Sequence, residues 1–169
     1  MTTEQSTIYL GLGSNLGNRA ENLKSALDML SHRLRPGKVS SIYDTEPIGN
    51  VNQPRFLNMV CQAYTMLSPH DLLALTQGIE LRMGRARGAS NLPRPIDIDI
   101  LFYGNQVIDT PELVIPHPRL HERAFVLVPM VEIAPVLKHP VIKKTVKQLL
   151  KNLGRVSGVS KWEGDGDNV

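Results

Sequence analysis

Runs and alternations of apolar residues predict four strands and two helices in the first part of the chain. The strands are predicted over residues 7–12, 38–45, 56–67 and 93–104, where apolar and β-branched residues predominate. The helices carry apolar stripes at helical spacing, with a cap at Asn18 for the first and at Ser68, followed by Pro69, for the second. The order strand, helix, strand, strand, helix, strand is that of the ferredoxin-like fold. We therefore expect an α+β protein whose first and fourth strands are antiparallel neighbours.

The pattern after the fourth strand predicts smaller elements. Gly104 and Asn105 are expected to form a tight turn between the fourth strand and residues 106–108, which gives a short added hairpin. A short helix is predicted over residues 124–131, ending near Pro129, and a last helix over residues 145–153. Residues 1–154 are expected to form one domain. Residues 155–169, rich in Gly and polar residues, are expected to form a loose tail.

Composition narrows the class of protein. With 41% hydrophobic and 21% charged residues, the 169-residue chain resembles one ordinary globular domain. A net charge of +3 allows an anionic ligand but lacks the dense basic stripe of a nucleic-acid binder. The single Cys61 excludes an intramolecular disulfide, and no signal peptide or membrane-spanning apolar run occurs. We expect a cytoplasmic monomer that binds small molecules and neither nucleic acid nor membrane.

Two carboxylates on the fourth predicted strand are the strongest indication of chemistry. Asp97 and Asp99 are two residues apart, so their side chains share one face while Ile96, Ile98 and Ile100 take the other. Asp is depleted in strands, and two carboxylates on one face repel each other unless a cation or a basic partner neutralises them. The pattern predicts a Mg²⁺ platform, and the alternative is a strand with one polar face.

An arginine-rich segment, residues 82–94, leads into the two aspartates. It contains no acidic residue, and Gly84, Gly88 and Pro93 mark much of it as a loop. Its arginines are Arg82, Arg85, Arg87 and Arg94. We expect a phosphate-binding loop beside the metal platform, although a single surface arginine is more often only solvated.

Two other loops are candidates for ligand contact. Gly11, Gly13 and Gly17 stand at the end of the first strand and in the turn after it, with a spacing one residue too long for the dinucleotide fingerprint, and no P-loop lysine follows. This turn either only joins strand to helix or lets a ligand approach the backbone closely. The irregular segment 46–55 is long for a connection between strands, which makes it a candidate substrate loop.

Five separated motifs resemble those of the 6-hydroxymethyl-7,8-dihydropterin pyrophosphokinases, a family of folate-pathway enzymes. The motifs are residues 9–17 (YLGLGSNLG), 43–49 (YDTEPIG), 53–58 (QPRFLN), 94–101 (RPIDIDIL) and 115–119 (IPHPR). Together they are far more specific than any one of them alone. The resemblance implies a ferredoxin-like fold, ATP and two Mg²⁺ ions. It also implies transfer of the terminal diphosphate of ATP to the pterin hydroxymethyl group, with release of AMP.

The matching positions imply a role for each site residue. Asp97 and Asp99 would hold the two metals, and Arg85 and Arg94 would be the catalytic arginines that grip the phosphates. ATP would contact Glu80, Arg87, Ile100, His117 and Arg123, with Glu80 accepting from adenine or ribose. The pterin would contact Thr45, Glu46, Ile48, Phe56, Asn58 and Phe125, with the aromatic rings stacking and Asn58 meeting the amide edge. His117 is alternatively a fixed turn residue, and the two Phe residues are alternatively core residues.

Departures from the family pattern concern the arginine loop most. Asn91 and Leu92 stand where many members have Trp and Gly, and the loop is one residue shorter. Phe56 replaces a common Tyr, Pro118 a common aromatic residue and Pro95 a common Thr. These changes bear on how the loop closes over ATP rather than on the reaction.

Two other classes of function remain as alternatives. A Mg²⁺-dependent nucleotidyltransferase could use the same Asp-x-Asp pair without the pterin residues. An RNA-binding ferredoxin-like module would need aromatic residues across its sheet, and the chain is only 5% aromatic.

Overall fold

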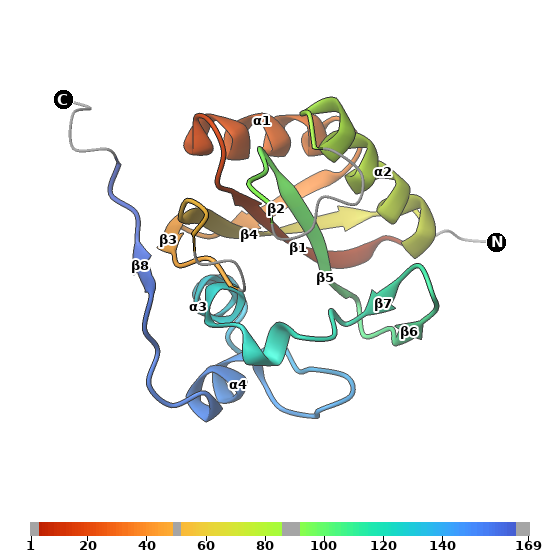
Figure 1. The fold of residues 1–169 in the computed structure, drawn as a ribbon. Coiled ribbons are helices and arrows are strands. Elements are labelled where there is room, and N and C mark those ends of the chain that lie inside the picture. The colour runs from red at the N-terminus through yellow and green to blue at the C-terminus, as the bar shows by residue number, and fades with distance from the viewer. Residues whose placement is uncertain (1–3, 49–51, 86–91, 165–169) are drawn as a thin grey trace.

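A six-stranded antiparallel sheet separates two layers of helices (Figure 1). The computed structural model describes residues 4–48, 52–85 and 92–164. The strands of this sheet are β1 (Ser6–Ser14), β2 (Arg35–Val39), β3 (Tyr43–Thr45), β4 (Phe56–Thr65), β5 (Asp97–Tyr103) and β8 (Val159–Lys161). Hydrogen bonding follows the order β5-β1-β4-β3-β8, and β2 also pairs with β4. The α+β, ferredoxin-like prediction is confirmed.

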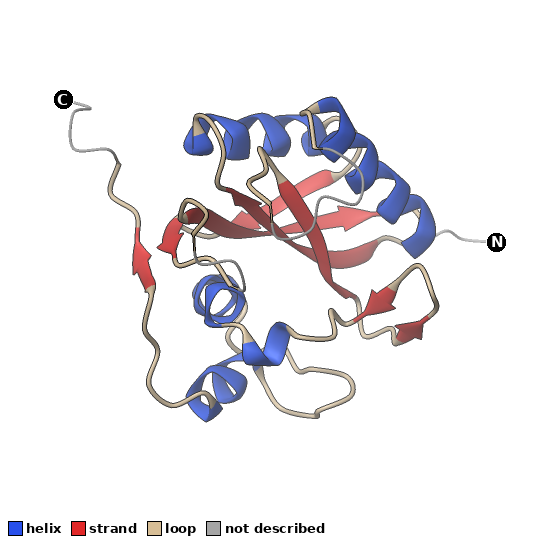
Figure 2. Cartoon of the chain, in the orientation of Figure 1, coloured by secondary structure: helices blue, strands red, loops and turns tan. Residues whose placement is uncertain are grey.

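Helices cover both faces of the sheet (Figure 2). They are α1 (Arg19–Ser31), α2 (Pro69–Arg82), α3 (Ala124–Ile133), α4 (Val146–Asn152) and the short 3₁₀ helix η1 (Leu120–Glu122). Helices α1 and α2 share a core with Ile98 and Ile100 of β5, whereas α3 and α4 share a second core with Tyr9 of β1 and Leu101 of β5. Burying a Leu or Ile side chain contributes roughly 1.5 to 3 kcal/mol, so these two cores hold the sheet as a firm platform.

The helix starts follow the capping signals in the sequence. The Asn18 side chain accepts a hydrogen bond from the backbone of Glu21, and the Ser68 hydroxyl accepts one from the backbone of Asp71. Thr145 and Gln148 form a complete capping box at the start of α4. These side chains satisfy amides that the first turn of a helix leaves without intrahelical partners.

The register of the central strands brings three loops to one end of the sheet. Strand β1 lies antiparallel between β4 and β5, so Gly13 is opposite Asn58 on one side and Asp97 on the other. The predicted pairing of the first and fourth strands is therefore confirmed. The glycine turn, the start of β4 and the start of the aspartate strand meet at this end.

Two predicted boundaries between strands are wrong. The single strand predicted over residues 38–45 is two strands, β2 and β3, interrupted at residues 40–42. Ser40 exchanges hydrogen bonds with the backbone of Val60, and the Ser41 amide donates to the Glu132 carboxylate, which bends the chain there. Gly104 and Asn105 do form a turn, but the hairpin predicted there is not formed with β5, because β6 (Ile108–Asp109) pairs instead with β7 (Val114–Ile115).

Two predictions about the C-terminal part are also wrong. Helix α3 continues through Pro129 to Ile133, because the buried apolar packing of this segment outweighs the one hydrogen bond that a proline cannot donate. The predicted loose tail contains β8, which pairs with β3. Three residues with one apolar side chain give little strand periodicity, and so this pairing left no clear signal in the sequence.

Candidate active site

A cavity of about 290 Å³ lies on the α3 side of the sheet, where the three loops meet. Its lining includes most of the residues singled out in the sequence: Thr45, Glu46, Ile48, Phe56, Asn58, Arg94, Asp97, Asp99, Arg123 and Phe125. Carboxylates, arginines and aromatic rings therefore share one space. Gly11 and Gly13, which lie within β1 and not in the turn after it, form part of the wall.

Asp97 and Asp99 both line the cavity, as their two-residue spacing predicts. Ile98 and Ile100 are buried in the core on the opposite face of β5. Burial, followed by the charge of Asp97, raises the pKa of Asp99 to about 7. Asp99 thus carries a carboxylate whose charge the surrounding protein leaves poorly compensated, the situation that a bound cation relieves.

Arg85 joins α2 to the aspartate strand. Its Nη1 donates to Glu80 Oε2 at 2.7 Å and to Asp97 Oδ1 at 2.5 Å, and Glu80 Oε2 also accepts from the amide of Ile98 at 2.8 Å. Burial acts to lower the pKa of Arg85, but the charges of Asp97 and Glu80 together outweigh it and raise that pKa. Burial raises the pKa of Glu80, with its hydrogen bonds opposing that change.

Arg94 lies between the carboxylates and the aromatic wall. Its Nη1 is 3.5 Å from Asp97 Oδ2, its Nε donates to the carbonyl of Leu92 at 3.0 Å, and its guanidinium carbon is 5.4 Å from the centre of the Phe56 ring. The side chain is therefore held by an ion pair, a hydrogen bond and a cation–π contact. It faces both the carboxylate of Asp97 and the ring of Phe56.

The opposite wall is built by β3 and β4. Asn58 Nδ2 donates to Thr45 Oγ1 at 2.7 Å, which fixes the direction of the amide. A Cβ atom on Gly13 would lie 2.4 Å from Asn58 Oδ1 and 3.4 Å from the Phe56 ring. Gly13 therefore leaves the space that the Asn58 side chain and the Phe56 ring occupy, and the contact of a ligand with this part of the backbone stays a prediction.

The remaining predicted residues differ in whether they line the cavity. Phe125 lines it with the Arg123 guanidinium 5.5 Å from its ring centre. Ile100 has its side chain in the core between the sheet and α1 and α2, away from the cavity. Arg87 lies outside the described residues. His117 does not line the cavity; its Nδ1 accepts from the amide of Arg119 at 3.3 Å.

His117 is neutral at physiological pH. Burial, followed by the charge of Arg123, lowers its pKa to about 4. Its amide also donates to the carbonyl of Leu101 at 3.1 Å, so both its backbone and its ring take part in the local turn. These contacts match the turn role and leave the ATP role as a prediction.

Sequence reasoning missed one residue that connects the three loops. Asn15 is 1% exposed, and its side-chain Nδ2 donates to Gln53 Oε1 at 2.8 Å and to the carbonyl of Pro54 at 3.1 Å. Its side-chain Oδ1 accepts from the backbone amide of Arg94 at 2.8 Å, and its backbone amide donates to the carbonyl of Arg94 at 3.1 Å. One side chain thus ties the glycine turn to the substrate loop and to the end of the arginine loop. Asn15 lies within the first family motif, but its partners 38 to 79 residues away carry no local signal.

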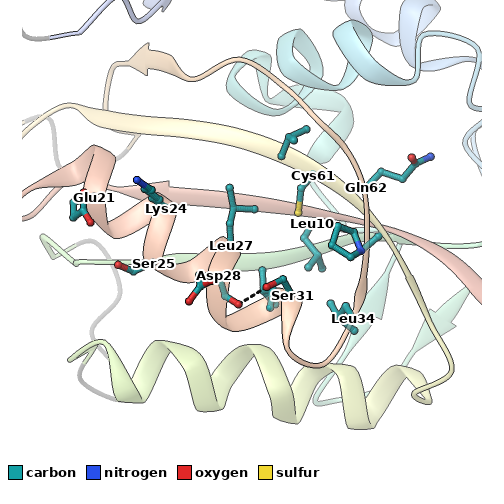
Figure 3. Close-up of a pocket in the computed structure, with 15 residues that line it drawn as sticks. Leu10, Glu21, Lys24, Ser25, Leu27, Asp28, Ser31, Leu34, Cys61 and Gln62 are labelled. Atoms are coloured by element: carbon teal, nitrogen blue, oxygen red, sulfur yellow. Dashed lines mark hydrogen bonds between the residues drawn. The ribbon is translucent and has the colours of Figure 1, made fainter.

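A larger cavity of about 510 Å³ lies on the other side of the sheet, beneath α1 and β2 (Figure 3). Its walls are mostly apolar and include Leu10, Leu27, Leu34 and Cys61. Burial raises the pKa of the Cys61 thiol to about 12, so this thiol is not a nucleophile at neutral pH. None of the predicted site residues lines this cavity.

Paired carboxylates and arginines around one cavity are typical of sites for phosphate-group transfer, and the aromatic rings beside them offer flat apolar surfaces to a ligand. Residues 9–135 match the family model described as 7,8-dihydro-6-hydroxymethylpterin-pyrophosphokinase. The chain belongs to this family of pyrophosphokinases, enzymes that transfer a pyrophosphoryl group.

Named relatives agree with this assignment. A 2-amino-4-hydroxy-6-hydroxymethyldihydropteridine pyrophosphokinase of Bacillus subtilis is 41% identical over 157 residues, covering 91% of this chain and 94% of the relative. The Aquifex aeolicus protein of the same name is 42% identical over 142 residues, covering 84% and 89%. A folic acid synthesis protein of Pneumocystis carinii is 42% identical over 139 residues, but these are only 19% of that longer protein.

Solved structures confirm the fold. The crystal structure of Plasmodium falciparum HPPK-DHPS A437G with SDX-DHP matches with a TM-score of 0.75 at 18% identity, over 89% of this chain and 46% of that chain. Among the described residues, no helix is both long and apolar enough to cross a membrane.

Proposed function

We propose that this chain transfers diphosphate from ATP to 6-hydroxymethyl-7,8-dihydropterin, releasing AMP, with two Mg²⁺ ions at Asp97 and Asp99. Family membership supports the pyrophosphoryl transfer. The observation that carries the residue assignment is that the carboxylates, Arg94 and the wall formed by Phe56 and Asn58 border the same cavity. A phosphate donor and a planar acceptor bound there would meet at the carboxylates.

The donor atoms fit Mg²⁺ held jointly by protein and phosphate. The described residues contain no cluster of three or more His, Cys, Asp or Glu side chains that would form a metal cage on its own. Mg²⁺ is usually held by one or two carboxylates together with water and substrate phosphates, which is what Asp97 and Asp99 would supply. When bound, the ions would neutralise charge on the triphosphate at the reacting phosphorus.

The arginines would bind and orient the triphosphate. Both contacts of Arg85 use Nη1, so the other N–H groups of its planar fork have no partner among the described residues. Arg85 would keep its carboxylate contacts and still donate to a phosphate. Arg94, held near Asp97 and over Phe56, would contact the transferred group and the edge of the acceptor together.

The acceptor would be held by shape and by hydrogen bonds. Phe56 and Phe125 offer apolar ring surfaces for a flat heterocycle, and the orientation of Asn58 by Thr45 fixes which part of its amide meets the ring edge. A nucleotidyltransferase would use the same carboxylates but would have no need of this second wall. The pterin wall therefore favours the pyrophosphokinase reaction over that alternative.

Separate titrations of pterin and of a non-hydrolysable ATP analogue test the assignment of the second wall. Phe56→Ala and Phe125→Ala are expected to weaken pterin binding by roughly 1 to 3 kcal/mol each, the scale of stacking on an aromatic side chain, with little change for the ATP analogue. The matched control is Phe102→Ala. Phe102 is 1% exposed and contacts the rings of Tyr9 and His139, so this change is expected to cost about 3 to 5 kcal/mol of stability.

The comparison among the three Phe variants decides the role of the rings. If Phe56→Ala and Phe125→Ala resemble Phe102→Ala, with a large fall in Tm and equal losses for both ligands, the two rings belong to the core. The proposed pterin wall would then be wrong.

A further inference from the structure

The strand β8 lies beside the part of β3 that lines the candidate site. Thr45 is opposite Val159 in the β3–β8 pairing and opposite Phe56 in the β3–β4 pairing. Beyond the last paired residue, the amide of Glu46 donates to the carbonyl of Gly158 at 2.9 Å. The backbone of the cavity wall at Thr45 and Glu46 is thus held from both edges of a three-residue strand.

The far end of β8 is also fixed. The amide of Trp162 donates to the carbonyl of Ile42 at 2.8 Å, and the indole ring packs against the core that α1 and α2 share. Figure 1 shows β8 as an outer strand that returns from α4 to lie along β3. This segment lies beyond residues 9–135, the part of the chain that the family model matches.

Gly158 lies against the side chain of Glu46, which is 66% exposed. A Cβ atom at this position would lie 2.7 Å from Cδ and Oε2 of Glu46 and 3.0 Å from its Cγ. The Glu46 carboxylate is in turn 4.0 Å from Nη1 of Arg55, whose Nε binds Asp44 at 2.6 Å. A Cβ atom on residue 158 would therefore make the Glu46 side chain turn toward solvent and would take its carboxylate from its present place at the edge of the cavity.

We propose that the segment 158–162 positions the acceptor wall of the active site, and that Gly158 acts in this through Glu46. Residues in this segment do not line the cavity; they set the backbone of Thr45 and Glu46, which do. Thr45 in turn accepts the hydrogen bond that orients Asn58. The inference rests on the proposed pterin function of this wall, and it makes Gly158 a positioning residue for the acceptor and not for ATP.

Gly154 offers a matched control. Gly154 and Gly158 have nearly equal positive φ angles, 72° and 73°, so an Ala brings similar backbone strain at either position. A Cβ atom on Gly154 would meet nothing within 4 Å. Comparing Gly158→Ala with Gly154→Ala in the full-length protein therefore separates the contact with Glu46 from general strain.

The test measures pterin and ATP-analogue affinity by titration, together with KM and kcat. Gly158→Ala is expected to raise the Kd and KM for the pterin by about 5- to 50-fold, because small displacements of positioning groups have large effects. ATP-analogue affinity should change less than about twofold, and Gly154→Ala should bind both ligands like the wild type. Equal pterin affinity of the two Ala variants would overturn the proposal.

A double-mutant cycle tests whether Gly158 acts on pterin binding through Glu46. In a Glu46→Ala background the clash is gone, so adding Gly158→Ala is expected to change pterin affinity by less than about twofold. A full effect of Gly158→Ala in that background would contradict the role of Glu46. Failure of the wild type to bind pterin would instead overturn the proposed function, whereas a wild type that binds pterin while both Ala variants match it would overturn only this inference.

Discussion

Asp99→Asn is expected to remove most of the activity while making the unliganded protein more stable above pH 7. The folded protein raises the pKa of Asp99 from 3.8 to about 7. Ionising this carboxyl therefore disfavours folding, and the penalty grows as the pH rises from about 4 and is complete above about 7. A pKa unit corresponds to about 1.4 kcal/mol, so the rise from 3.8 to about 7 sets an upper limit of about 4 kcal/mol. Because the buried Asn amide also loses hydration, removing the carboxylate is expected to add roughly 1 to 3 kcal/mol to the free energy of unfolding at pH 8.

Asp97→Asn provides the contrast. Asp97 pairs with both Arg85 and Arg94, so its loss leaves two partly buried guanidinium groups without their shared partner. This variant is expected to be less stable than the wild type and equally impaired in activity, by about 100-fold or more. Unfolding measured between pH 5 and 9, with steady-state rates at saturating Mg²⁺, separates the two. Turnover like the wild type in either variant would remove the pair from the mechanism.

Arg85→Ala and Arg94→Ala are expected to lower kcat by about 100-fold or more, with smaller effects on pterin binding. Contacts that strengthen as charge moves toward the leaving AMP act mainly in the transition state, so their loss appears in kcat. Arg94 also covers the Phe56 ring at 5.4 Å, so Arg94→Ala should weaken pterin binding more than Arg85→Ala does.

Arg82→Ala is the control for these two variants. Arg82 belongs to the same acid-free segment, but its side chain is exposed at the end of α2. Its replacement is expected to leave kcat and pterin affinity near the wild-type values. If Arg85→Ala and Arg94→Ala lose pterin affinity and keep kcat, these arginines belong to the pterin pocket and not to phosphate binding.

The parts of the fold that the sequence predicted well have short-range causes. Asp97 and Asp99 share one face because of the two-residue period of a strand, and the caps at Asn18 and Ser68 act within one turn of helix. Topology then placed Gly13 beside Asp97, because antiparallel neighbours bring the end of one strand to the start of the next.

The parts that the sequence did not predict depend on contacts between distant segments. Asn15 acts through residues 38 to 79 positions away. Strand β8 is held by its pairing with the edge of β3, and its own apolar pattern is weak. Helix α3 passes Pro129 because the core surrounds it. Ile100 is a different case, because the two-residue period of the strand had already predicted its side chain on the face opposite the carboxylates, and there it lies in the core.

The identity of the products decides whether this chain transfers diphosphate or a nucleotide to the pterin. Purified protein is incubated with ATP, Mg²⁺ and 6-hydroxymethyl-7,8-dihydropterin, and the phosphorus-containing products are separated, with Asp99→Asn and a reaction without pterin as controls. AMP and the pterin diphosphate are expected in equal amounts, formed only when pterin is present and nearly lost in Asp99→Asn. Release of inorganic diphosphate, with the nucleotide joined to the acceptor, would contradict this expectation and indicate nucleotidyl transfer instead.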